Sequence, residues 1–149
     1  MHVRLSKDRE DGVWTLYTQA SILDAADLVE WRERIVVALE PLDQRIDLLL
    51  DLSGLTLHPG IASLFALVAS DELAPRAKQL FHYGASPGTA AAFRLAYSYV
   101  RLYENREEAL DVLDAIRRDR LLLRRSGTML SPSASDRQML EVSIREKKR

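Results

Sequence analysis

His58 is the residue whose type and position could most readily do chemistry. It precedes Pro59-Gly60, which we interpret as the turn into a helix, and the free N–H groups at a helix N-terminus attract anions. An imidazole there could act as a ligand, a base or a pH-sensitive contact. The nearest carboxylate is Asp51, and no further base or metal ligand stands at a readable spacing. We therefore interpret His58 as a solvated loop histidine, and a small enzyme built on His58 and Asp51 remains an alternative.

Other signs of catalysis or cofactor binding are weak. The chain has no cysteine, which excludes a thiol nucleophile and a zinc site built on thiolates. Its six glycines form neither a dinucleotide-binding motif nor a Walker sequence. His82 stands between Phe81 and Tyr83 in a predicted strand, where we expect it on a strand face or at a sheet edge. We therefore expect a protein that is not an enzyme and holds no metal or cofactor.

The composition favours a folded cytoplasmic protein. The 149 residues carry 21 Lys and Arg against 22 Asp and Glu, a formal net charge of −1. The apolar stretch at residues 61–70 is far shorter than the roughly 20 residues of a membrane-spanning helix. No apolar segment of a secretory signal follows the first four residues. We therefore expect no membrane span.

The hydrophobic pattern predicts strands that alternate with helices. Asp24 and Ser86 suit the N-cap position of two helices, and Asn105 with Glu108 resembles a capping box at a third. This alternation predicts an α/β fold, with a mixed, mostly parallel sheet flanked by helices. The expected strands are residues 3–5, 13–20, 46–52, 79–83 and 99–104, and the expected helices are residues 24–40, 61–68, 87–97 and 106–116.

Two of these helices show apolar residues at helical spacing. In the first, the predicted buried stripe is Leu28, Trp31, Ile35 and Leu39; in the second, it is Ile61, Leu64, Phe65 and Val68. The second helix is more apolar around its circumference than a half-exposed helix requires. Its surplus of apolar residues could line a cavity or form a dimer interface.

The last part of the chain differs in charge from the rest. Residues 119–149 carry a net charge of +4, so residues 1–118 carry −5. Apolar residues alternate with the basic ones there, which favours docking on a protein surface over binding of nucleic acid. We therefore predict a domain at residues 1–118 and a basic C-terminal extension at 119–149, with linker-like sequence at 126–127 and 131–135 and a short final helix capped by Ser135.

Three segments of the chain, taken with the order of elements, resemble the STAS domain family of anti-sigma-factor antagonists and its SpoIIAA-like branch. The segments are ASILDAA at residues 20–26, DLLLDLSGLTL at 47–57 and LYENREEAL at 102–110. They resemble the turn into the first helix, the central strand with its loop, and the last strand with the start of the final helix. The resemblance covers residues 1–116 and implies a regulatory protein that binds a protein partner.

The chain departs from that family at the phosphorylated serine. Regulatory members carry an Asp-Ser-Ser-Gly sequence at the start of the helix after the central strand, whereas residues 57–63 here read LHPGIAS. Gly60 or Ile61 falls where the switch serine would be, and neither can accept a phosphoryl group. Thr56 lies before the position of the switch serine, and Ser63 lies after it. The resemblance therefore implies a member that is not phosphorylated at this site.

The resemblance also implies a binding surface and, as an alternative, a carrier of a small apolar or lipid ligand. Independently of the resemblance, the surplus apolar residues of the second helix could form a homodimer. The implied partner, possibly an anti-sigma-type regulator, would contact two segments that begin predicted helices: Thr56, Leu57, His58, Pro59, Gly60, Ile61 and Ser63 in the first, and Ser86, Gly88 and Thr89 in the second.

Overall fold

The computed structural model describes residues 1–96 and 100–127. The predicted helix end at residue 97, the predicted strand start at residue 99, the linker at 131–135 and the final helix capped by Ser135 lie outside these residues. The chain divides into two compact units, residues 1–111 and residues 112–149. The first unit contains the whole sheet, and the second begins within the last helix.

The element order confirms an α/β fold. The strands are β1 (His2–Lys7), β2 (Trp14–Ile22), β3 (Ile46–Asp51), β4 (Leu55–Leu57), β5 (Ala77–Tyr83) and β6 (Leu102–Tyr103). The helices are α1 (Ala25–Leu39), α2 (Ala62–Leu73), α3 (Pro87–Ala96) and α4 (Arg106–Gly127), with a single 3₁₀ turn at Ala74–Arg76.

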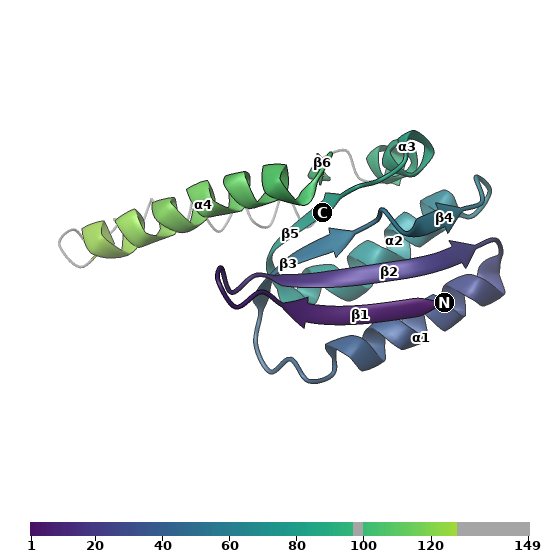
Figure 1. Ribbon diagram of the computed structural model, residues 1–149, viewed down its shortest axis with the longest axis horizontal. Helices are drawn as coiled ribbons and strands as arrows, with labels where there is room; N and C mark the ends of the chain where they lie inside the picture. The colour runs from purple at the N-terminus through teal and green to yellow at the C-terminus, as the bar shows by residue number, and fades with distance from the viewer. Residues whose placement is uncertain (97–99, 128–149) are drawn as a thin grey trace, which may run out of the picture. The chain divides into compact units, whose positions relative to one another are not determined.

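The sheet is mixed and mostly parallel, as predicted. Its strand order is β1-β2-β3-β5-β6, and β4 pairs with the end of β2. Among the strands of the described residues, only the β1–β2 hairpin is antiparallel, whereas the pairs β2–β3, β2–β4, β3–β5 and β5–β6 are parallel (Figure 1). The carboxyl ends of the parallel strands therefore lie at one edge of the sheet, and the loops that lead into α2 and α3 begin there.

Local hydrogen bonds begin these helices where the sequence predicts them. Asp24 Oδ1 accepts a hydrogen bond from the Asp27 N–H at 2.9 Å, and Ser86 Oγ accepts one from the Thr89 N–H at 3.3 Å. Asn105 Oδ1 accepts one from the Glu108 N–H at 2.9 Å. Each cap satisfies an N–H group that the helix itself leaves without an acceptor.

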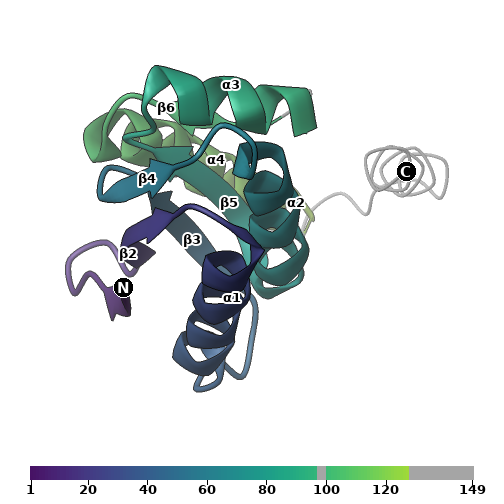
Figure 2. The same cartoon turned by 90° about the vertical axis from the view of Figure 1, so that its right-hand side faces the viewer.

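The core is built from one sheet face and from the helices that cover it. Figure 2 shows α1 and α2 side by side along this face. The rings of Trp31 and Phe65 lie 4.4 Å apart, and those of Phe65 and Phe93 lie 6.1 Å apart. A row of aromatic rings therefore joins α1, α2 and α3, and α2 packs beside α3.

The buried stripe of α1 is confirmed, whereas that of α2 is confirmed at Phe65 and wrong at Leu64. Leu64 is 46% exposed, and Ile61 precedes the helix as its N-cap. Because α2 is apolar around most of its circumference, periodicity alone could not show which side turns inward. The residues of α2 that are buried are Ala62, Phe65, Ala66, Ala69 and Leu73.

Strands β4 and β6 and helix α4 also differ from the predictions. The strand β4 was not predicted, because three residues are too few to show a period. The strand β6 is shorter than the predicted one and has two residues. The helix α4 continues past residue 118 and includes Ser126 and Gly127, which we predicted as linker. The predicted division at residue 118 therefore coincides with no break in secondary structure.

Candidate functional site

The two predicted contact segments lie at the same edge of the sheet, the edge formed by the carboxyl ends of the parallel strands. The first runs from β4 into α2, and the second runs from β5 into α3. Ligands of open α/β sheets commonly bind at this edge, because the loops there follow rigid strands. We call the exposed members of the two segments the loop surface; they are Thr56, His58, Pro59, Gly60, Ser63, Ser86 and Gly88.

The remaining three predicted contact residues are less accessible. Ile61 is 9% exposed and Thr89 is 4% exposed, so both lie beneath the surface and support it. Leu57 is half-buried and packs against the core. A partner at this edge would therefore meet the seven residues of the loop surface rather than all ten predicted ones.

His58 has a structural role within the first segment. Its Nδ1 accepts a hydrogen bond from the Gly60 N–H at 3.0 Å, and its own backbone N–H donates to the Ile22 carbonyl at 3.0 Å. The imidazole thus stabilises the turn before α2 by a hydrogen bond within that turn. Within the described residues, no hydrogen bond or ion pair joins His58 to Asp51, so the structure does not assemble the pair that the enzyme alternative requires.

Exposed leucines extend the loop surface along α2. Leu64 is 46% exposed and Leu67 is 41% exposed, and the spacing of three places them on the same side of the helix. Ser63 of the loop surface lies one position before Leu64 and four positions before Leu67, so it is a helical neighbour of Leu67. The loop surface therefore continues into an apolar patch, which sequence reasoning missed because Leu64 was assigned to the core.

Residues 84–88 match the G-x-S-x-G pattern of a nucleophile elbow, a match that sequence reasoning missed. The strand–turn–helix context of that pattern is present, since β5 ends at Tyr83 and α3 begins at Pro87. However, the positive φ falls on Gly84, at +77°, and no described residue other than glycine has one. Ser86 Oγ lies 3.1 Å from Thr89 Oγ1 and caps α3. Ser86 is therefore a helix cap and lacks the strained geometry of a nucleophile elbow.

Asp51, at the end of β3, fastens the two loops that follow β3 and β5. Its carboxylate accepts hydrogen bonds from the Ser53 N–H at 2.9 Å and from the Tyr83 hydroxyl at 3.1 Å. A Cβ on Gly84 would lie 3.1 Å from the Cβ of Ser53, so a larger residue would push the loops apart. Burial, followed by the charge of Asp51, raises the pKa of Tyr83, so its hydroxyl stays protonated and donates.

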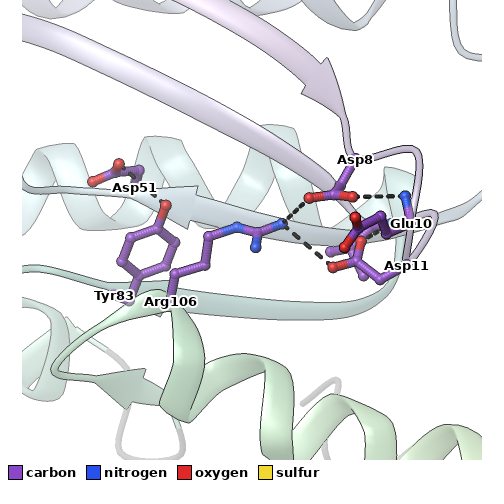
Figure 3. A network of polar contacts seen from close by, with 7 residues as sticks. Asp8, Glu10, Asp11, Asp51, Tyr83 and Arg106 are labelled. Carbon is purple, nitrogen blue, oxygen red and sulfur yellow. Dashed lines mark hydrogen bonds and ion pairs between the residues drawn. The ribbon is translucent and has the colours of Figure 1, made fainter.

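Arg106 forms a second polar cluster beside Tyr83. Figure 3 shows its guanidinium directed from the start of α4 toward the β1–β2 hairpin. Its Nη2 lies 3.4 Å from the carboxylate of Asp8 and 3.6 Å from that of Asp11. All three side chains are partly exposed, so these ion pairs position the hairpin and contribute little stability individually.

His82 is a face residue of an interior strand. It is 3% exposed, and its strand β5 lies between β3 and β6, so the edge position that we also considered is wrong. Burial lowers the pKa of His82 to about 4. The imidazole is therefore neutral near pH 7.

Two further classes of site find no support in the part of the chain that the structure describes. Residues 1–96 and 100–127 contain no group of three or more His, Asp or Glu side chains that could hold a metal ion. No helix in these ranges is long and apolar enough to cross a membrane.

Solved structures with the same arrangement of elements as this chain include a variant of RsbS and the anti-sigma factor antagonist SpoIIAA. A serine-to-glutamate variant of RsbS from Moorella thermoacetica matches 79% of this chain and 99% of its own, with a TM-score of 0.53 and 18% identity. The anti-sigma factor antagonist SpoIIAA in its unphosphorylated form matches 76% of this chain and 97% of its own, with a TM-score of 0.51 and 15% identity. This chain has the SpoIIAA-like fold.

A third structure with the SpoIIAA-like fold agrees. It is an uncharacterised protein of the DUF3478 family from Shewanella loihica, which matches 75% of this chain and 92% of its own, with a TM-score of 0.50 and 18% identity. No protein-family model and no curated protein sequence matches the chain. The resemblance to the STAS domain family is thus confirmed at the level of the fold.

Proposed function

We propose that this protein is a non-enzymatic regulatory module that binds a protein partner through the loop surface and the adjoining leucines of α2. The observation that carries the proposal is the continuity of exposed loop residues with exposed Leu64 and Leu67. Protein interfaces combine an apolar centre with a polar rim, and this edge of the sheet offers both. The similarity in fold to an anti-sigma factor antagonist supports the same class of function.

The elements beneath this surface are held in fixed positions, which also supports binding. Asp51 ties the ends of β3 and β5 together, and the contact between Phe65 and Phe93 fixes α2 beside α3. A surface held in place before binding loses less entropy when it meets a partner. The loop surface is therefore suited to a partner that binds a preformed shape.

Control by phosphorylation at the start of α2 does not suit the residues present. Gly60 has no side chain, and Ile61 is apolar and buried. Ser63 and Thr56 are exposed, but Ser63 lies inside α2 and Thr56 lies in β4. We propose that partner binding is constitutive or controlled by another means.

Photo-crosslinking would test the proposal and identify the partner. A photoreactive phenylalanine analogue is introduced at Ser63, and a matched analogue at Val37, which is 66% exposed on α1. The full-length variants are irradiated in the cells that produce the protein, and the crosslinked species are identified by mass spectrometry. A specific protein crosslinked from position 63 and absent from position 37 supports the proposal. Equal crosslinking from both positions, or none from position 63, contradicts it.

The other occupant to consider for this surface is a second copy of the chain. In that case the species crosslinked from position 63 would be the protein itself, and sedimentation would show a dimer. The small apolar carrier that we considered along α2 is less suited to the fold there, because Ala62, Phe65 and Ala66 are packed in the core.

A further inference from the structure

The solvent-facing side of α1 combines exposed valines with exposed glutamates. Val29, Val36 and Val37 are between 38% and 66% exposed. Glu33 and Glu40 are exposed as well, and neither forms an ion pair within residues 1–96 and 100–127. The two arginines of this helix are already paired, with glutamates of α1 and α2. This side of α1 is therefore apolar and negatively charged.

A shallow hollow lies among these side chains. Its volume is about 330 Å³, and it is lined by Val29, Arg32, Glu33, Val36 and Val37. The first four of these residues stand at positions i, i+3, i+4 and i+7 of the helix. Four residues at this spacing form the hole that receives one side chain of a facing helix. The side of α1 that faces solvent therefore has the shape to accept an apolar side chain from another helix.

Residues 117–124, which we call the distal segment of α4, offer the opposite charge. The segment contains four arginines and one aspartate. Leu121, Leu122 and Leu123 are between 55% and 71% exposed. Arg118 and Arg124 are exposed and lie three positions before and after Leu121, so they flank it on one side of the helix. Within the described residues, neither arginine forms an ion pair.

The arrangement of these leucines favours a protein surface over a lipid surface. A basic helix that lies on an anionic membrane separates an apolar face from a charged one. Leu121, Leu122 and Leu123 are successive residues and point about 100° apart around α4, so they do not share one face. Leu121 lies on the same side as Arg118 and Arg124. That mixed side of the distal segment matches a surface of valines and glutamates.

We propose that the distal segment of α4 docks on α1 of a second copy of this protein. Leu121 enters the hollow of α1, and the arginines beside it meet Glu33 and Glu40. An apolar contact with charged groups at its rim is the usual composition of a protein interface, and the opposite charges select the partner surface. Because each copy carries both surfaces, the contact can form twice in a symmetric dimer.

This contact is separate from the loop surface, so the proposal is independent of the protein-binding function above. A photoreactive group at position 37 should accordingly crosslink to a second copy of this protein. The mass of that product distinguishes it from the partner that we expect at position 63.

Cysteine crosslinking tests the location of the contact, because the chain has no cysteine of its own. Full-length Val37→Cys and Leu122→Cys, one of them carrying a mass tag, are mixed and treated with a short bismaleimide. The control mixture combines Leu122→Cys with Leu95→Cys, since Leu95 is 83% exposed on α3. We expect about tenfold more crosslinked heterodimer from the first mixture, because docking raises the local concentration of the two thiols. Equal yields from the two mixtures would overturn the proposal.

Sedimentation equilibrium of full-length variants tests the charges. Glu33→Arg and Arg124→Glu should each weaken dimerisation about fivefold, because each brings like charges together, and the double variant should recover most of the loss. Asp71→Arg, which reverses an exposed carboxylate on α2, should change it little. A dimer that neither Glu33→Arg nor Arg124→Glu weakens would overturn the proposal. A protein that stays monomeric and binds phosphatidylserine vesicles would also overturn it and assign the distal segment to a membrane.

Discussion

The hydroxyl of Tyr83 donates a hydrogen bond to the carboxylate of Asp51 at 3.1 Å, and this bond joins the last residue of β5 to the last residue of β3. The same carboxylate receives the N–H and the hydroxyl of Ser53, at 2.9 Å and 2.6 Å. One acidic side chain therefore joins the end of β5, which leads into the second contact segment, to the end of β3, which leads through β4 into the first.

Replacing Tyr83 with Phe removes this hydrogen bond and keeps the ring. We expect Tyr83→Phe to lower the free energy of unfolding by about 1–2 kcal/mol, because the acceptor is a charged, partly buried carboxylate. Urea unfolding would measure the change. The control is Tyr103→Phe, whose ring packs 5.4 Å from Phe81 and whose hydroxyl bonds no described residue. A loss in Tyr103→Phe as large as that in Tyr83→Phe would argue against a role for the bond.

His82 should make the stability of the protein depend on pH. The pKa of His82 is lowered from 6.5 in the unfolded chain to about 4 in the folded one. Between these values the unfolded chain binds more protons, so acid favours unfolding. The contribution of His82 to the free energy of unfolding is fully present above about pH 6.5. It decreases by about 3 kcal/mol in total as the pH falls through 4.

The test compares unfolding of the unmodified protein and of His82→Leu at about pH 7 and about pH 4.5. The unmodified protein should lose about 2–3 kcal/mol more than the variant over this interval. The control His2→Gln removes an exposed histidine of β1 and should behave like the unmodified protein. If His82→Leu and the unmodified protein lose the same free energy, the buried imidazole does not cause the acid sensitivity.

Residues 56–63 should carry no phosphate after treatment with an anti-sigma-type kinase. Gly60 and Ile61 offer no hydroxyl at the start of α2, and the hydroxyls of Thr56 and Ser63 lie outside the register of the switch serine. Phosphopeptide mass spectrometry would measure the modification. Gly60→Ser supplies a hydroxyl where the switch serine would be and is the matched positive control. A phosphopeptide from this segment of the unmodified chain would contradict the prediction.

Much of the fold could be predicted because its signals are local. Asp24, Ser86 and Asn105 each cap a helix through a bond to a residue three positions on, so the sequence contains both partners within one turn. The stripe of α1 was also clear in the middle of the helix, because the charged residues 32–34 separate Trp31 from Ile35. The mixed, mostly parallel sheet followed from the alternation of these elements with apolar runs.

The remaining features depend on contacts that are distant in sequence. Asp51 and Tyr83 are 32 positions apart, and nothing near either residue indicates the bond between them. The inward side of α2 depends on which residues meet Trp31 and Phe93, so Leu64 was wrongly assigned to the core. A cavity lined by Ser70, His82 and Arg101 joins residues up to 31 positions apart, and no periodicity predicts an empty space. The place of the loop surface was predictable, whereas the apolar patch beside it was not.

The central claim is that a protein partner binds the loop surface and the leucines of α2. The most direct test measures the affinity of the crosslinked partner for Leu64→Asp and for Val37→Asp by isothermal titration calorimetry. Both residues are exposed apolar side chains, 46% and 66% accessible, so both variants should fold. We predict that Leu64→Asp weakens binding by about tenfold or more and that Val37→Asp changes it little. Unchanged binding by Leu64→Asp, or an equal loss in Val37→Asp, would contradict the account.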